Sequence, residues 1–402
     1  MGKIKLPTQT TAFTTTATTL YIYILLIKGA LLMTFVCEKE KLQEAINIVQ
    51  KAAAVSSTIP VLMGILIKAQ KEKIILSCNN LDIAIVCEID AVVSDPGEVV
   101  VNSRLLGDIV KKIVGEKITV SILEKTVVQI KTESSCFDVV GMGTEEFPEI
   151  PSVQKEFSFV IQKKKLKEII KGTIFAAGTS ESKLILTGCL IDVEEHSVRC
   201  VAVDGFRLAL RETATENKET GSFVVPSRSL NEFNKIIAEN EDEISVSISK
   251  KNIIFEYEGV RFISRLLEGN YIDYKNFIPK DFQTMVRADA AELEAAVERA
   301  SLMITNESNK SPIIIKIESG KMEISCETQM GKAIEKLSPE IEGDSLRIGF
   351  NHKYLLDAIR ACPSENFMMG FGNNIAPCLM YPKNEDGGYK YMVLPLRIRE
   401  NG

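Results

Sequence analysis

The feature that most constrains the fold of this chain is a unit that occurs three times. In its clearest copy, from Val201 to Arg211, two apolar runs flank Asp204 and Gly205. Because Gly accepts positive φ and Asp tolerates it, this pattern predicts a β-hairpin with a tight turn. Comparable patterns start at Ile74 and Met322. The strands predicted to follow the hairpins end at residues 124 and 125 positions apart, Val101, Val225 and Phe350. A period this constant predicts three copies of one domain.

Each predicted hairpin lies between two predicted helices of similar length. The upstream helices start at Glu38, Gln162 and Asp289, and the downstream helices at Asn102, Pro226 and Asn351. Asn is a favoured N-cap residue, and Pro suits the first helical position. We therefore expect an α+β fold in which two helices pack on antiparallel sheets in each copy.

Length, charge and cysteine usage limit the classes of protein that fit. With 402 residues, the chain has room for about three domains of roughly 100 to 200 residues each. Its nine cysteines are scattered without a CxxC pair, which is typical of small buried hydrophobes in a reducing compartment. The formal net charge is −6, so any nucleic-acid binding must come from a local arrangement of charge.

The first 32 residues do not fit the repeat. They contain a threonine-rich tract and an apolar run interrupted by Lys28. This run is too short for an ordinary transmembrane helix, although a signal-like or interfacial anchor stays open. The first repeat begins at Met33 as the second begins at Phe157. We therefore interpret residues 1–32 as a leader that is disordered or not native.

Proline-containing connectors divide the remaining chain. The acidic segment from Glu145 and the segment from Asn270 each end in Pro, which cannot continue a central strand. The predicted domains are therefore residues 33–151, 152–280 and 281–402. The apolar run from Tyr391 to Ile398 contains Pro395, and this pattern favours a last edge strand, with a position against a groove as the alternative.

The sequence contains no motif typical of an enzyme. His196 and His352 lie in different repeats without a metal-binding spacing, and turn geometry explains Asp204. There is no phosphate-binding GxxxxGK[ST] loop and no GxSxG elbow. We therefore expect no catalytic residue, no metal and no cofactor.

Four short motifs in this order, on the threefold repeat, resemble one known family. They are "EEFPEIP" and "DYKNFIP" at the ends of the first two copies, "VDGFRLAL" in the middle copy and "YMVLPLRI" near the C-terminus. From Met33 to Ile398 the chain resembles the bacterial DNA polymerase III β subunit, the sliding clamp. The resemblance implies three clamp-type domains per chain, a ring closed by a head-to-tail homodimer, and duplex DNA in its hole. It also implies a cytoplasmic, non-catalytic processivity factor that tethers the replicative polymerase, the clamp loader and other proteins with a clamp-binding motif.

The resemblance places cationic helices around the DNA. A sliding ring should attract phosphates without reading bases. The residues then expected to face DNA are Arg104, Lys111, Lys112, Lys163, Lys164, Lys165, Lys167, Lys171, Arg228, Lys235, Lys353 and Arg360. The helix from Asp289 to Met303 is acidic and argues against an even positive lining.

The resemblance also implies a groove for an apolar partner peptide between the second and third domains. Its walls would be Leu186, Val203, Gly205, Phe206, Arg207, Leu208, Ile272, Phe277, Ile375, Pro377, Met392, Val393, Leu394, Pro395, Leu396 and Arg397. The chain departs from the family at Ile272, where proline is frequent, at Phe206, where histidine is frequent, and in four residues after Ile398. Its peptide preference is therefore expected to differ.

At the subunit contact, the resemblance places Phe137 of one chain against Met303 and Ile304 of the other. A repeat scaffold that binds proteins without encircling DNA is the alternative function. Such a scaffold would share the fold and the apolar C-terminal strip, but it would not require the lysines from Lys163 to Lys171 to face a common hole.

Overall fold

The structure is a computed structural model. It describes residues 33–123, 126–151, 155–249, 251–305, 311–383 and 388–398. The predicted leader and the last four residues lie outside this part of the chain. The described residues form two compact units. The first comprises residues 33–151 and 256–263, and the second comprises the other described residues.

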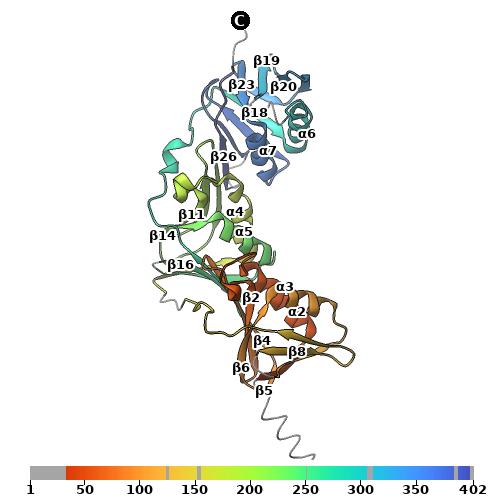
Figure 1. The fold of residues 1–402 in the computed structure, drawn as a ribbon. Coiled ribbons are helices and arrows are strands. Elements are labelled where there is room, and N and C mark those ends of the chain that lie inside the picture. The colour runs from red at the N-terminus through yellow and green to blue at the C-terminus, as the bar shows by residue number, and fades with distance from the viewer. Residues whose placement is uncertain are drawn as a thin grey trace, which may run out of the picture. The chain divides into compact units, whose positions relative to one another are not determined.

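In the first unit, helices α2 (Lys39–Val49) and α3 (Ser103–Lys112) pack against each other (Figure 1). The short 3-10 helices η1 and η2 span Gln50–Ala52 and Pro60–Met63. One antiparallel sheet has the order β5-β1-β7-β8-β9, and strands β4-β3-β2-β6 pair side by side in another. The strands are β1 (Met33–Glu38), β2 (Gly64–Gln70), β3 (Lys73–Asn79), β4 (Ile83–Asp90), β5 (Val92–Asp95), β6 (Gly97–Asn102), β7 (Lys117–Ile122), β8 (Val127–Lys131) and β9 (Cys136–Val140).

The second unit repeats this arrangement of elements. Helices α4 (Lys163–Lys171) and α5 (Ser227–Ile236) pack together, as do α6 (Ala290–Ser301) and α7 (His352–Ala361) (Figure 1). The 3-10 helices are η3 (Ile174–Ala176), η4 (Glu181–Thr187) and η5 (Tyr274–Phe277). β10 (Phe157–Gln162) pairs with β15 (Glu243–Ile248), and β16 (Asn252–Tyr257) and β17 (Val260–Arg265) follow along the chain.

A nine-stranded antiparallel sheet runs through the second unit in the order β14-β11-β12-β13-β26-β25-β24-β18-β22. A four-stranded sheet has the order β21-β20-β19-β23. The strands are β11 (Gly188–Val193), β12 (Ser197–Val203), β13 (Arg207–Ala214), β14 (Gly221–Pro226), β18 (Thr284–Asp289), β19 (Ile313–Glu318), β20 (Lys321–Thr328), β21 (Gly331–Leu337), β22 (Glu340–Gly343), β23 (Leu346–Phe350), β24 (Asn366–Phe371), β25 (Cys378–Pro382) and β26 (Tyr389–Val393).

The three predicted hairpins are present as β3–β4, β12–β13 and β20–β21. At the tip of β12–β13, the Asp204 carboxylate accepts hydrogen bonds from the backbone N–H of Phe206 and Arg207 at 2.8 and 3.0 Å. Gly205 has a φ of 94°, which an L side chain would make unfavourable. The sequence therefore predicted both the hairpin and its turn for the right reason.

The prediction that the last strand lies at the edge of a sheet is wrong. β26 pairs with β13 on one side and with β25 on the other, so it lies inside the nine-stranded sheet. Pro395 follows the strand by two residues, so its missing N–H removes no hydrogen bond from the ladder. The proline therefore affects where the strand ends, but it does not decide whether the strand lies inside the sheet or at its edge.

Two smaller predictions also change. α5 begins at Ser227, so Pro226 is its N-cap residue and not its first helical residue. Seven of the cysteines are buried as predicted, but Cys136 is exposed and Cys362 is half-buried. Burial raises the pKa of the Cys78 and Cys378 thiols, which therefore behave as apolar side chains. No helix in the described ranges is long and apolar enough to cross a membrane.

Candidate functional site

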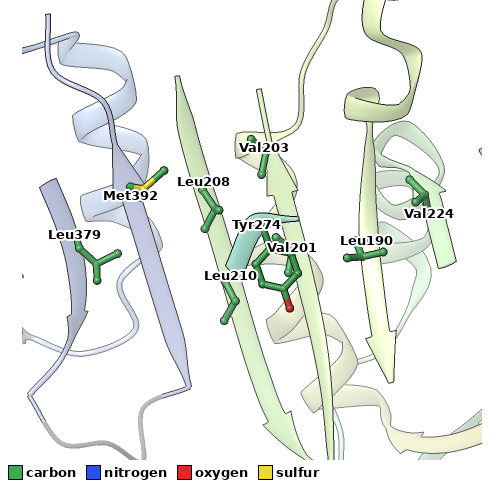
Figure 2. Packing of buried hydrophobic residues seen from close by; sticks show 9 residues of the cluster. All are labelled: Leu190, Val201, Val203, Leu208, Leu210, Val224, Tyr274, Leu379 and Met392. Carbon is green, nitrogen blue, oxygen red and sulfur yellow. The ribbon is translucent and has the colours of Figure 1, made fainter. Parts of the chain in front are cut away.

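An apolar cluster covers one face of the sheet where the second repeat meets the last strand. Val203 of β12, Leu208 of β13 and Met392 of β26 point to the same side (Figure 2). The same two hairpin strands, the neighbouring strands and η5 add the remaining buried members, Leu190, Val201, Leu210, Val224, Tyr274 and Leu379. The cluster therefore joins the second and third repeats through one apolar face.

Four predicted groove residues belong to this apolar cluster: Val203, Leu208 and Met392 within it, and Ile272 packed against it. Leu186 is buried outside it, and Gly205, Phe277, Ile375 and Arg397 are exposed. The sequence analysis missed the partly buried rim, Ile185, Leu267, Tyr271, Ile278, Phe282 and Tyr381. The signal for several of these was the run of apolar residues in the segment interpreted only as a connector.

Arg207 and Val393 do not line this face. They pair with each other across β13 and β26, and successive side chains of a strand point to opposite sides. Val393 is 1% exposed, and the Arg207 side chain contacts Asp357 of helix α7. Both side chains therefore lie on the helix-covered face, which corrects their prediction as groove walls.

The tip of hairpin β12–β13 and the residues after β26 meet at the end of the apolar cluster. The backbone N–H of Leu394 donates to the carbonyl of Phe206 at 2.8 Å. The N–H of Leu396 donates to Gly349 at 2.8 Å, so the chain around Pro395 is held at both sides. Phe206 is 57% exposed, and its ring stacks on Tyr354 of α7 with centroids 6.1 Å apart. An exposed aromatic ring next to a buried apolar face is a feature of peptide-binding surfaces.

Most cations predicted to face DNA are exposed on the helices. The exposed set is Arg104, Lys111, Lys112, Lys164, Lys171, Arg228, Lys235, Lys353 and Arg360. Among the residues that the structure describes, Arg104, Lys111, Lys112, Lys171, Arg228 and Lys353 make no ion pair with a carboxylate. These side chains can reach phosphates without first breaking a salt bridge.

The lysines at the start of α4 are not equivalent. Lys163 is 1% exposed, and its Nζ lies 3.5 Å from Asp242, so its prediction as a DNA-facing residue is wrong. Lys165 donates to the carbonyl of Ala214 and Lys167 to that of Ile237, at 3.0 and 2.9 Å. A helix that packs on a sheet buries one of its faces. The sequence analysis counted all five lysines of α4 as DNA-facing and did not distinguish the buried face from the exposed one.

Arg360 is paired with the acidic helix α6. Its Nε donates to Glu294 at 2.6 Å, and its Nη2 donates to Glu298. These hydrogen bonds are the main reason that the pKa of Arg360 is raised above its usual value. The helix pair of the third repeat therefore presents less free positive charge than α4 does.

One sheet edge in the first repeat and one in the third carry exposed apolar residues. β9 is the edge of its sheet, with Phe137 40% and Val140 79% exposed. β21 is the edge of another sheet, and beside it Met330 is 72% and Ile334 is 45% exposed. Of the predicted contact residues, Met303 accepts a hydrogen bond from Thr328 at the β20–β21 turn, and Ile304 follows it. The sequence analysis missed Val140, Met330 and Ile334.

A cavity of about 770 Å³ lies at the other end of hairpin β12–β13, away from its tip. It is lined by Glu194, Glu195, His196, Ser197, Arg199, Glu212, Thr213, Ala214 and Gly388. Burial opposes the charge on Arg199, but hydrogen bonds to Glu194 and Glu212 outweigh it and raise the pKa of this group. In the described ranges, no group of three His, Cys, Asp or Glu side chains is placed to hold a metal ion.

Comparison with known proteins covers the whole repeat. Family models match in order: DNA polymerase III beta subunit, N-terminal domain at residues 33–151, central domain at 160–273 and C-terminal domain at 275–397. The beta sliding clamp of Staphylococcus aureus is 31% identical over 379 residues, covering 91% of this chain and 100% of the relative. That of Halalkalibacterium halodurans is 31% identical over 369 residues, covering 88% and 97%. The crystal structure of the DNA polymerase sliding clamp from Bacillus subtilis matches with a TM-score of 0.87 and 30% identity, over 91% of this chain and 100% of that chain.

Three α+β domains of one type, each with a helix pair packed on antiparallel strands, define a clamp of the DNA replication machinery. The chain belongs to the DNA polymerase III beta subunit family, the beta sliding clamps. The fold class and the function that the sequence predicted are thereby confirmed.

Proposed function

We propose that the protein encircles duplex DNA as a head-to-tail homodimer and tethers the replicative polymerase, the clamp loader and other clamp-binding proteins to it. The observation that carries this proposal is the match of all three domain models, in order, from residue 33 to residue 397. The domains would span residues 33–151, 152–280 and 281–402. The protein would act in the cytoplasm, where a bacterial chromosome is replicated, as a non-catalytic subunit without a cofactor.

The threefold repeat suggests how two copies close the ring. Inside the chain, β13 of the second repeat pairs with β26, the last strand of the third. The equivalents of these two strands, β21 and β9, are each left at a sheet edge. Since a head-to-tail contact joins unlike surfaces, β21 of one copy would pair with β9 of the other as β13 pairs with β26.

Equivalent bridges fix the register of this contact. Val100 and Gly349 occupy the same position in the first and third repeats, and they bridge Met142 and Leu396 respectively. Met142 therefore corresponds to Leu396, and Val140, two residues earlier, corresponds to Leu394. Met330 donates to Thr328 at its turn as Phe206 donates to Asp204, so Met330 corresponds to Phe206. The hydrogen bond from Leu394 to Phe206 would therefore recur between Val140 of one copy and Met330 of the other.

This register pairs residues of matching chemistry. Lys332 and Asp138 are the equivalents of Leu208 and Met392, which lie opposite each other within the chain. Lys332 of one copy would therefore lie opposite Asp138 of the other. Phe137 falls opposite Ala333 on the helix side, towards the end of α6 where Met303 lies. Val140 and Met330, both more than two-thirds exposed in one chain, would be covered. Exposed apolar edge strands are otherwise prone to aggregation, which supports their role as an interface.

DNA would be held by enclosure and by diffuse positive charge. The exposed cations without a carboxylate partner lie on α3, α4, α5 and α7, and flexible Lys and Arg side chains bind phosphates independently of sequence. We propose that Arg104, Lys111, Lys112 and Lys171 are the main contributors. Lys163 makes no contact with DNA in this proposal, because it is buried.

Partner proteins would bind through a short apolar peptide at the apolar cluster. The proposed contact residues are Phe206 and the chain around Pro395, together with Val203 and Met392. Leu208 is 1% exposed and would support this surface from the interior. The cluster combines buried side chains with partly buried aromatic residues at its rim, which suits an extended apolar ligand.

Retention on circular DNA tests the proposal. The protein is loaded by a bacterial clamp loader onto a nicked circular duplex, and the bound fraction is measured before and after one cut by a restriction enzyme. A clamp stays on the circle and slides off the linear product. Equal retention on both forms would contradict enclosure, and no retention on either would favour a scaffold that binds proteins alone.

A further inference from the structure

Arg207, at the tip of hairpin β12–β13, is almost fully covered. Its side chain is 11% exposed and lies on the face of the sheet opposite to Leu208. A surface arginine would ordinarily extend into solvent, since its guanidinium is well hydrated on its polar edge. Its burial at the junction of two repeats indicates that neighbouring groups hold it there.

Four groups from three elements surround the Arg207 guanidinium. Nε donates to Asp204 at 2.9 Å, and Nη1 donates to Asp357 of α7 at 2.6 Å. The ring of Tyr354, also on α7, lies 4.5 Å from the guanidinium carbon, and the ring of Phe175 in η3 lies 5.5 Å from it. Ion pairs and aromatic faces together fix the plane of a guanidinium, which an ammonium group could not replace.

These contacts connect the turn of the second repeat to a helix of the third. Asp204 also accepts from the backbone N–H of Phe206, so the carboxylate held by Arg207 is the one that shapes the turn. Tyr354, in contact with the Arg207 guanidinium, is also the ring on which Phe206 stacks. Arg207 therefore contacts both the carboxylate that shapes the turn of Phe206 and the ring on which Phe206 stacks.

We propose that Arg207 is a positioning residue for the partner-peptide site and not part of its wall. It holds Phe206 and Tyr354 as a preformed apolar platform at the end of the apolar cluster. Without the guanidinium, the negative charges of Asp204 and Asp357 would no longer be compensated and would repel each other. This repulsion would move the tip of the hairpin away from α7. A preformed platform strengthens peptide binding because less ordering occurs on association. The inference rests on the proposed function.

Arg199 supplies a matched control on the same hairpin. It also bonds several carboxylates, with Glu212 at 2.9 Å, Asp192 at 3.7 Å and Glu194 as a third, and its side chain is 18% exposed. All of these partners belong to the second repeat, at the end of the hairpin away from the tip. Replacing Arg199 therefore removes a comparable ion-pair network without touching the platform.

The test measures binding of a synthetic fluorescent peptide that carries the clamp-binding segment of a bacterial DNA polymerase. We expect Arg207→Gln to raise the dissociation constant of the peptide about tenfold. A change of this size lies in the range of interaction energies measured between contacting residues. Arg207→Lys should recover little, because an ammonium group lacks the fork. Arg199→Gln should leave the dissociation constant unchanged even where it lowers the melting temperature.

A double-mutant cycle separates positioning from general destabilisation. If Arg207 acts through the platform, Arg207→Gln should raise the dissociation constant much less than tenfold when Phe206 has already been replaced by alanine. Equal effects in both backgrounds, or unchanged binding by Arg207→Gln, would overturn the inference. Failure of the unsubstituted protein to bind the peptide would instead contradict the proposed function. The full-length dimer is used throughout, and its mass in solution confirms that each variant is assembled.

Discussion

At the scale of single residues, the structure separates charges that the sequence shows as equivalent. Lys163 and Lys164 are adjacent in a basic run, but Lys163 is 1% exposed while Lys164 lies on the surface and pairs with Glu241 at 3.3 Å. The difference arises because one side of α4 packs against the fold. A count of lysines therefore overestimates the charge that DNA can meet, and two substitutions test what individual polar groups contribute.

Lys163→Ala should destabilise the protein without changing its affinity for DNA. The substitution removes a buried aliphatic stem and a partner of Asp242, and we expect a loss of roughly 1 to 3 kcal/mol in the free energy of unfolding. Thermal unfolding and equilibrium binding to duplex DNA provide the two measurements. Lys163→Met, which keeps the stem, should retain most of the stability. A weaker affinity of Lys163→Met for DNA, with its stability intact, would show that the ammonium group reaches phosphate.

Glu98 should make stability depend on acid pH. The hydrogen bond from Thr144 at 2.9 Å, assisted by Lys68, lowers the pKa of Glu98 below its usual value of 4.5, although burial acts in the opposite direction. The folded state then binds fewer protons, so this stabilisation is present above the unfolded pKa and is lost as pH falls through the folded pKa. Glu98→Gln should lower the melting temperature at about pH 7, and the difference should shrink as the pH falls below the usual carboxyl pKa of 4.5 and through the lowered pKa of the folded state. The exposed Glu146 is the control position, and a difference that is independent of pH would exclude the ionised carboxylate as its cause.

At the scale of elements, strand neighbours decide what each strand does. β26 is short and ends before a proline, yet it lies inside a sheet because β13 and β25 both pair with it. β9 and β21 also carry apolar side chains, but these are partly exposed because each strand lies at the edge of its sheet. A truncation that tests the peptide site must therefore keep Val393, since a cut after Tyr391 would remove part of an interior strand.

A charge swap tests the proposed pairing of β9 with β21. Asp138→Lys or Lys332→Asp alone places like charges opposite each other and should weaken the homodimer several-fold. The double variant restores the opposite charges and should recover the dimer, as measured by sedimentation at low concentration. Asp108→Lys, on helix α3, is the control. If the double variant dissociates as readily as the two single variants combined, the register is wrong.

At the scale of the whole molecule, positive charge is distributed unevenly among the three helix pairs. α4 carries five lysines, whereas α6 carries Glu292, Glu294 and Glu298 and neutralises Arg360. An uneven lining suits a ring that must hold DNA loosely, because phosphates then have no continuous set of strong contacts. The proposed DNA contacts are therefore concentrated in the first two repeats.

The salt dependence of DNA binding tests this distribution. Each phosphate contact contributes about 0.9 to the slope of log K against log salt, so Lys112→Gln, present twice in a dimer, should reduce the slope by up to about 1.8. Arg360→Gln should change it much less, since two glutamates already neutralise that side chain. The pair Glu294→Gln and Glu298→Gln should increase it. Equal reductions for Lys112 and Arg360 would show that all three repeats contact DNA alike.

Much of the fold could be predicted from local pattern. The turn at Asp204 and Gly205, the helix caps at Asn102 and Asn351, and the alternation of apolar residues in β12 and β13 are properties of short segments, so the sequence showed them directly. The regular spacing then predicted three copies of one domain. The family resemblance added the ring, the groove and the DNA-facing helices as expectations.

By itself the sequence determined the repeat and its secondary structure, because these depend on periodicity and turn chemistry within each copy, whereas the class of protein was inferred from the resemblance of its motifs to a known family. The tertiary structure alone decided that Lys163 is buried, that Arg207 turns towards α7, that Arg360 meets α6 and that β26 lies between two strands. Each of these outcomes depends on which face of an element packs and on residues as many as 150 positions away in the chain. Local pattern carries no information about such partners, which are brought together when the repeats pack against each other.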